Sequence, residues 1–225
     1  MAVVCFLFFL LFEKKGIVRY GQYKRKKEEG GSIRVLLRHR IIKFSLISII
    51  TGVVRTTVVF WLPTYISQYL GFSAERSAVI FTIATFVISE TAFIAVFIYE
   101  RLNRNMDLTI LIMFSLAAVF FLMVYLIKQP LFNIIFLVLA VMSSGCCASM
   151  LWSRYCPSLR DTGMVSGATG FLDFLSYMAA AASSTIFASA VADIGWQNLV
   201  LVWMALMIAG VITALPYRKN MKQEI

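Results

Sequence analysis

The chain is organised as long apolar runs separated by short polar connections. A helix needs about 20 mostly apolar residues to cross a bilayer, and six runs reach that length. They cover residues 44–70, 77–99, 108–127, 131–152, 163–190 and 196–215. Connections as short as Lys128–Gln129–Pro130 and Asp193–Ile194–Gly195 place successive helices antiparallel. The pattern therefore predicts an all-α, polytopic membrane protein with six transmembrane helices.

The segments outside this six-helix transmembrane domain, predicted at 44–215, have a different character. Residues 1–12 are apolar but too few to cross a bilayer, so we expect them to be the remnant of a preceding transmembrane helix. Residues 13–43 are basic and polar and contain four glycines, which is typical of a linker. Residues 216–225 form a polar tail.

Basic residues are distributed unevenly over the connections. Lys and Arg accumulate in the cytoplasmic loops of membrane proteins. The linker and every second connection after it are basic, whereas the alternate connections carry only Arg76 and Lys128. We therefore predict a multi-pass protein of the cell membrane with a cytoplasmic linker and C-terminus. The basic residues predicted to follow the linker on that side are Arg101, Arg104, Arg154, Arg160, Arg218, Lys219 and Lys222.

Composition narrows the classes of function. The chain is 60% hydrophobic and 14% charged, whereas soluble domains are near half apolar and about a quarter charged. The net charge of +10 lies mainly in the connections, where attraction to anionic headgroups explains it, so the expected partner is the lipid bilayer and not nucleic acid. The four cysteines and His39 lack metal-ligand spacing, and no nucleotide-binding or hydrolase motif occurs. We expect no enzyme activity, metal or cofactor.

Arg55 is the most informative residue, because it lies halfway along an apolar run. A cation near the bilayer centre is costly unless a partner, a cavity or a substrate compensates it. Ser48, Thr51 and Arg55 follow one helical stripe, which should face protein or water. Arg55 is therefore a candidate binding residue for an anion. The alternative is an arginine that locks two helices together through a carboxylate.

Two acidic residues, Glu90 and Asp173, also lie inside apolar runs. At 1.5 Å per residue, Arg55, Glu90 and Asp173 lie roughly 14–16 Å from the predicted cytoplasmic ends of their helices. Their similar depth favours a shared polar cavity near the midplane. Both acidic residues are candidates for an ion pair that fixes helix packing, or for a proton carrier if burial raises one pKa.

Small residues and one proline predict local features of the first and fifth helices. Gly163, Gly167 and Gly170 follow one face, a spacing that lets helices pack closely and move during gating. Trp61 and Pro63 predict a kink near the outer end of the first helix, with Tyr65 as an anchor at the interface.

These residues resemble a known family. The run VVRTTVVFWLPTYISQYLGFS resembles the seventh helix of the organophosphate:phosphate antiporters, the glycerol-3-phosphate and hexose-phosphate carriers of the major facilitator superfamily. That helix carries an arginine before a W-x-P-T-Y motif, and here Arg55 precedes Trp61–Tyr65 at the matching offset. The segments GMVSGATGFLDFLSYMAAA and DIGWQNLVLVWMALM resemble the eleventh helix and the region of the twelfth. Tyr99–Glu100–Arg101 lies where the superfamily has its Asp-Arg/Lys loop motif.

The resemblance implies the C-terminal half of a carrier that works by alternating access, with substrate bound between two halves. The implied substrate is a small organic anion such as glycerol-3-phosphate or a sugar phosphate, with Arg55, Thr51 and Tyr65 as candidate binding residues. The implied partner is an N-terminal six-helix half or a second copy of this chain. Three alternatives remain open: a carrier for another solute, a membrane sensor of a phosphorylated metabolite, and an inactive fragment.

Overall fold

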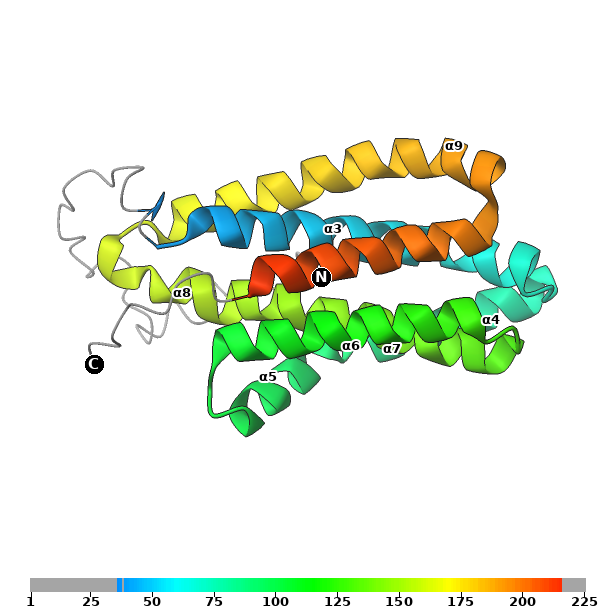
Figure 1. Ribbon diagram of the computed structural model, residues 1–225, viewed down its shortest axis with the longest axis horizontal. Coiled ribbons are helices and arrows are strands. Elements are labelled where there is room, and N and C mark those ends of the chain that lie inside the picture. The colour runs from blue at the N-terminus through cyan, green and yellow to red at the C-terminus, as the bar shows by residue number, and fades with distance from the viewer. Residues whose placement is uncertain (1–35, 38, 216–225) are drawn as a thin grey trace, which may run out of the picture. The chain divides into compact units, whose positions relative to one another are not determined.

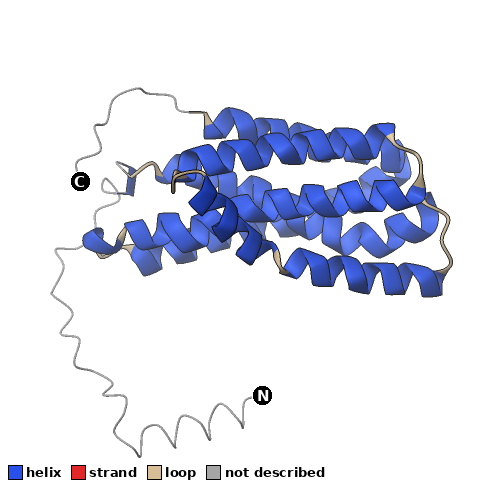
Figure 2. Ribbon diagram, turned by 90° about the horizontal axis from the view of Figure 1, so that it is seen from below, coloured by secondary structure: helices blue, strands red, loops and turns tan. Residues whose placement is uncertain are grey.

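The computed structural model of the protein describes residues 36–37 and 39–215, which belong to one compact unit. The predictions for residues 1–12, for most of 13–43 and for 216–225 lie outside the described residues. The described part consists of helices and connections and contains no strand (Figure 2). Five of its helical segments are long and apolar enough to cross a membrane. The predicted all-α, polytopic membrane fold is confirmed.

The helices follow the predicted runs, with small changes at their ends. Three of the spans combine an α-helix with a shorter helical element. In chain order the elements are α3 (Ile41–Thr64), η1 (Tyr65–Tyr69), α4 (Ala74–Ser89), α5 (Thr91–Arg101), α6 (Met106–Leu126), α7 (Pro130–Met150), η2 (Leu151–Tyr155), α8 (Cys156–Ser158), η3 (Arg160–Thr162) and α9 (Val165–Ala214).

The last helix, α9, covers two of the six predicted runs. It has 50 residues and is interrupted at Gly195, whose φ of 75° and ψ of 166° are not helical. Figure 1 shows the two arms of α9 running in opposite directions from this bend. Both arms contact α3, because Ser48 Oγ donates to Leu172 O at 2.8 Å and Trp203 Nε1 donates to Thr57 Oγ1 at 3.0 Å. The interruption falls within the predicted Asp193–Gly195 turn.

Two of the predicted helices change geometry along their length. The run predicted as one helix at 77–99 is divided at Glu90, where ψ is near −2° and α4 gives way to α5. The kink predicted at Trp61 and Pro63 corresponds to a change of helix type. Pro63 lies inside α3, and the next turn, η1, is a π-helix.

Close helix packing depends on three glycines that the sequence pattern did not single out. A Cβ on Gly52 would lie 2.3 Å from Ser176 Oγ and 2.9 Å from Ser176 O, which brings α3 against the first arm of α9. A Cβ on Gly145 would lie 2.8 Å from Thr91 Cγ2, so that α7 meets α5. Gly210 faces the Phe114 ring, where the second arm of α9 meets α6. Packing of this kind is the main source of helix association in lipid.

One end of the bundle is basic and joins several helices. Asp107, at the start of α6, accepts from Arg40 and from Lys43 Nζ, each at 2.9 Å. Lys43 Nζ also donates to Ala214 O at 2.9 Å, so the same lysine holds the end of α9. At this end Tyr155 of η2 donates to His39 O at 3.0 Å. The beginnings of α3 and α6 and the ends of η2 and α9 therefore meet on one side.

Candidate functional site

Arg55 lies on the side of α3 that the rest of the described chain leaves open. Its side chain is exposed, while Val54, directly before it, and Thr51, one turn earlier, are buried. It forms no ion pair or hydrogen bond with any other residue of the described part of the chain. The alternative in which Arg55 locks two helices through a carboxylate has no such contact to support it here.

Arg55 borders a hollow of about 760 Å³ between α3, α4, α5 and α7, called here the larger hollow. Ligand pockets commonly measure about 300–1,000 Å³, so the larger hollow has the size of a binding site. Most of its wall is apolar or aromatic, with hydroxyl groups at intervals. Residues that define it include Arg55, Phe60, Phe81, Thr85, Ala92 and Trp152.

A second hollow, of about 410 Å³, lies on the other side of Arg55 between α3, α7, η2 and α9 and is called the smaller hollow. It brings together two of the charged residues predicted to share a cavity, Arg55 and Asp173. The hydroxyl of Thr51, also predicted as a binding residue, is buried and donates to Ile47 O at 2.8 Å. Residues that define the smaller hollow include Thr51, Arg55, Trp152, Asp173, Ser176 and Tyr177.

Glu90, the third charged residue predicted at this depth, is not brought to either hollow. It is exposed at the junction of α4 and α5 and forms no ion pair with the described residues. The two neighbours of Glu90, Ser89 and Thr91, do line the larger hollow. The lining residues Thr85, Ile88 and Ala92 follow one helical face, and at helical spacing Glu90 lies on the opposite face.

Tyr65 of the W-x-P-T-Y motif lies away from both hollows. It is buried, and its hydroxyl donates to Asn133 Oδ1 at 2.7 Å. Its ring meets that of Trp196 edge-on with centroids 5.5 Å apart, and Trp61 also contacts Trp196 at 6.1 Å. These contacts join η1 and the C-terminal end of α3 to α7 and to the second arm of α9.

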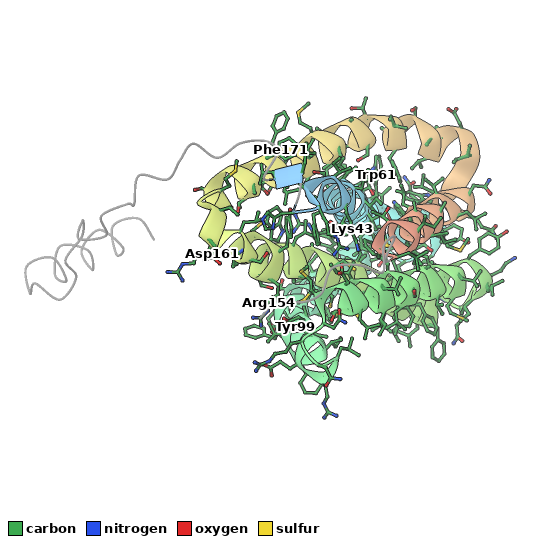
Figure 3. The ribbon with its side chains drawn as sticks, turned by 60° about the vertical axis from the view of Figure 1, so that its left-hand side comes forward. Lys43, Trp61, Tyr99, Arg154, Asp161 and Phe171 are labelled. Carbon is green, nitrogen blue, oxygen red and sulfur yellow. The ribbon has the colours of Figure 1, made fainter. Side chains whose placement is uncertain are left out.

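The glycine face predicted to pack against another helix is open in the described chain. A Cβ on Gly167 or Gly170 would meet nothing within 4 Å, and Phe171 beside them is exposed and lies on the outer side of α9 (Figure 3). Gly163 has a φ of 68° and ends η3. The first arm of α9 instead packs through a narrow stripe of mostly small residues. That stripe is Ala168, Leu172, Ser176, Ala180, Ser183 and Phe187.

A second cation, Arg154, is held by an aromatic ring and not by a carboxylate. Its guanidinium lies over the Tyr99 ring, 4.5 Å from the centroid, and the two are neighbours in Figure 3. The Arg154 Nε is buried without a hydrogen-bond partner in the described chain. The contact joins the end of α5 to η2, the π-helical turn that also carries Trp152.

Trp152 and Phe60 are the wall residues that sequence reasoning missed. Aromatic residues are common in apolar runs, so neither stood out. Phe60 lies five positions after Arg55, which is not the same helical face, so spacing gave no signal for it. Trp152 lies at helical spacing after Gly145, Ala148 and Ser149, which line the same hollow, and this spacing was the available signal.

The described residues show no group of three His, Cys, Asp or Glu side chains that could hold a metal ion. Cys146, Cys147 and Cys156, predicted as small packing residues, are buried free thiols. Neither observation adds chemistry to the hollows around Arg55.

Comparison with known proteins identifies the family. The family profile described as Major Facilitator Superfamily matches residues 1–182, most of the chain. No curated protein and no solved structure matched the chain. The profile match agrees with the apolar helices and supports a membrane transporter in general. The chain belongs to the major facilitator superfamily.

Proposed function

We propose that this chain takes part in the transport of a small organic anion, with a phosphate ester such as glycerol-3-phosphate or a sugar phosphate as the leading substrate class. The observation that carries the proposal is the position of Arg55, exposed between two hollows and free of any carboxylate partner in the described chain. A cation in an apolar span needs a compensating group. An anionic substrate supplies one.

The chemistry of arginine favours a phosphate or carboxylate group. A guanidinium presents a planar fork of donors that matches two oxygens of such a group, which an ammonium cannot do. The W-x-P-T-Y motif six residues after Arg55 resembles that of carriers for phosphate esters. Arg55 and Thr51 are the predicted binding residues that border the hollows. The Thr51 hydroxyl donates to Ile47 O, so the proposal rests on Arg55 and not on Thr51 or Tyr65.

Alternating access requires a second set of helices opposite Arg55. We propose that an N-terminal six-helix half or a second copy of this chain covers the side of α3 on which Arg55 is exposed. The open glycine face of α9 at Gly167 and Gly170 supports this, because small residues admit a closely packed helix. We place the basic end, with Arg40 and Lys43, on the cytoplasmic side of the cell membrane.

The test compares Arg55→Lys with Arg101→Lys in the full chain reconstituted in vesicles. Uptake of a labelled phosphate ester, and its binding in detergent, are both measured. We expect Arg55→Lys to weaken binding at least about tenfold, because the charge stays but the fork is lost. Arg101, exposed at the end of α5, serves as the matched control.

Three results separate the candidate functions. Binding and uptake that both depend on Arg55 support a carrier. Binding without uptake, in the presence of the second half, would instead support a sensor. Binding that is unchanged in Arg55→Lys would contradict the proposed role of Arg55.

A further inference from the structure

We infer that the anion recognised by this site carries an apolar, ring-sized body, with its charged group at Arg55 and its body in the larger hollow. This inference rests on the anion recognition by Arg55 that the proposed function describes, and it replaces the polar body of glycerol-3-phosphate or a sugar phosphate with an apolar one. It is drawn from the different chemistry of the two hollows that Arg55 separates.

The wall of the larger hollow is suited to hydrocarbon. Aromatic rings come from three different elements, α3, α4 and η2, and branched aliphatic side chains fill the space between them. An aryl or alkyl body would bury apolar surface on this wall, whereas a body rich in hydroxyl groups would lose most of its bonds to water there. These apolar wall residues are Val59, Phe60, Phe81, Ile88, Val141 and Trp152.

Two hydroxyl groups of α4 in the larger hollow do not compete with Arg55 for an anion. Thr85 Oγ1 donates to Phe81 O at 2.8 Å, and Ser89 Oγ donates to Thr85 O at 2.8 Å. Their protons are therefore used within α4, and only their lone pairs face a ligand. Arg55 is the charged donor among the residues that line this hollow, so it is the group that attracts an anion.

The smaller hollow has the opposite preference. Asp173 offers only acceptor oxygens when ionised, and Thr169 Oγ1 donates to Val165 O at 2.8 Å, as Thr51 Oγ1 does to Ile47 O. This side therefore repels an anionic group and favours a donor of the ligand. The charged group is thus directed to Arg55, and an apolar body attached to it has room on the side of the larger hollow.

The experiment titrates the full chain in detergent with matched probes. 1-Naphthyl phosphate and 1-naphthoate carry an apolar body with the two possible charged groups, glycerol-3-phosphate carries a polar body, and 1-naphthol lacks the charge. We expect the better of the two naphthyl anions to bind at least about tenfold tighter than glycerol-3-phosphate, from the apolar area buried, and 1-naphthol to bind weakly. The stronger naphthyl anion identifies the charged group.

Two variants test the location. Ala92→Phe should fill the larger hollow and weaken binding of the naphthyl anions severalfold, while Ala78→Phe, exposed on α4 away from the hollows, should not. Phe60→Ser removes an aromatic wall residue whose side chain is 67% exposed, so its effect does not depend on folding. It should also weaken naphthyl binding.

The outcomes distinguish this inference from the proposed function. Glycerol-3-phosphate binding as tightly as both naphthyl anions, with no effect of Ala92→Phe or Phe60→Ser, would overturn the inference and leave anion recognition by Arg55 standing. Naphthyl binding that is unchanged in Arg55→Lys, and as tight for uncharged 1-naphthol as for the anions, would overturn both the inference and the proposed function. Preference for a naphthyl anion that is lost in both wall variants would establish the inference.

Discussion

The helix α7 and the pair α4–α5 are almost equally apolar, yet they are packed very differently. The spans that contain them have mean hydropathies of 2.3 and 2.1. Eleven residues of α7 are buried, whereas α4 and α5 bury two each. The difference teaches that hydropathy in a membrane protein reports whether a helix suits hydrocarbon, and not whether its neighbours are protein. The open pair α4–α5 is also the one that borders the larger hollow.

The largest effect on stability is expected when a buried phenylalanine, rather than an exposed one, is replaced by alanine. Phe121 of α6 is fully buried against Trp203, with ring centroids 6.0 Å apart, while Phe93 of α5 is 75% exposed. Phe121→Ala should lower the free energy of unfolding by about 3–5 kcal/mol, because the cavity it leaves cannot close fully. Phe93→Ala should change it by less than about 0.5 kcal/mol. Unfolding in detergent, followed by circular dichroism, measures both, and equal effects would erase the distinction between the regions.

The next prediction compares two glycines, Gly52 on the packed side of α3 and Gly170 on the open side of α9. Gly52→Ala forces a Cβ against the backbone of Ser176, and overpacking of this kind costs about 1–3 kcal/mol. Gly170→Ala meets open space and should leave stability unchanged or slightly raised, since alanine favours helix. The same unfolding measurement applies. A destabilised Gly170→Ala chain would mean that the open glycine face is already covered within this chain.

The third prediction concerns Asn133, a buried polar residue in the well-packed region. Asn133 accepts from Tyr65 and donates to Val124 O at 2.8 Å and Ile127 O at 2.9 Å. Asn133→Ala leaves three polar groups without this partner and should cost about 1–3 kcal/mol, whereas Tyr65→Phe removes one bond and should cost about 1 kcal/mol. The order of the two melting temperatures tests the argument, and a more harmful Tyr65→Phe would contradict it.

The smallest effect is expected at the basic end. Asp107 holds Arg40 and Lys43, but about a third of its side chain is exposed, so solvent screens both pairs. Asp107→Asn should lower stability by about 1 kcal/mol or less, and high salt should reduce the difference from the unmodified chain. A loss that salt does not change would indicate that hydrogen bonding, and not charge, joins these ends.

The sequence predicted which segments form helices, but not which face of each helix packs against its neighbours. Six long apolar runs predicted the helices, and helical spacing predicted that Arg55 and Thr51 share one side of their helix. Both border the smaller hollow, as does Asp173. Glu90 was expected there as well, but Thr85, Ile88 and Ala92 line the larger hollow at helical spacing, which puts Glu90 on the opposite face. The packing glycines, such as Gly52, cannot be told from Gly170 by spacing, because only the neighbouring helix decides which face is filled.

Gly195 has a consequence for how the protein is made. Its backbone conformation, with φ 75° and ψ 166°, is essentially confined to glycine. Because this one residue reverses the 50-residue α9, no hydrophilic loop separates the two arms. We therefore expect the two arms to enter the bilayer as a helical hairpin, with the orientation of the second arm set by that of the first.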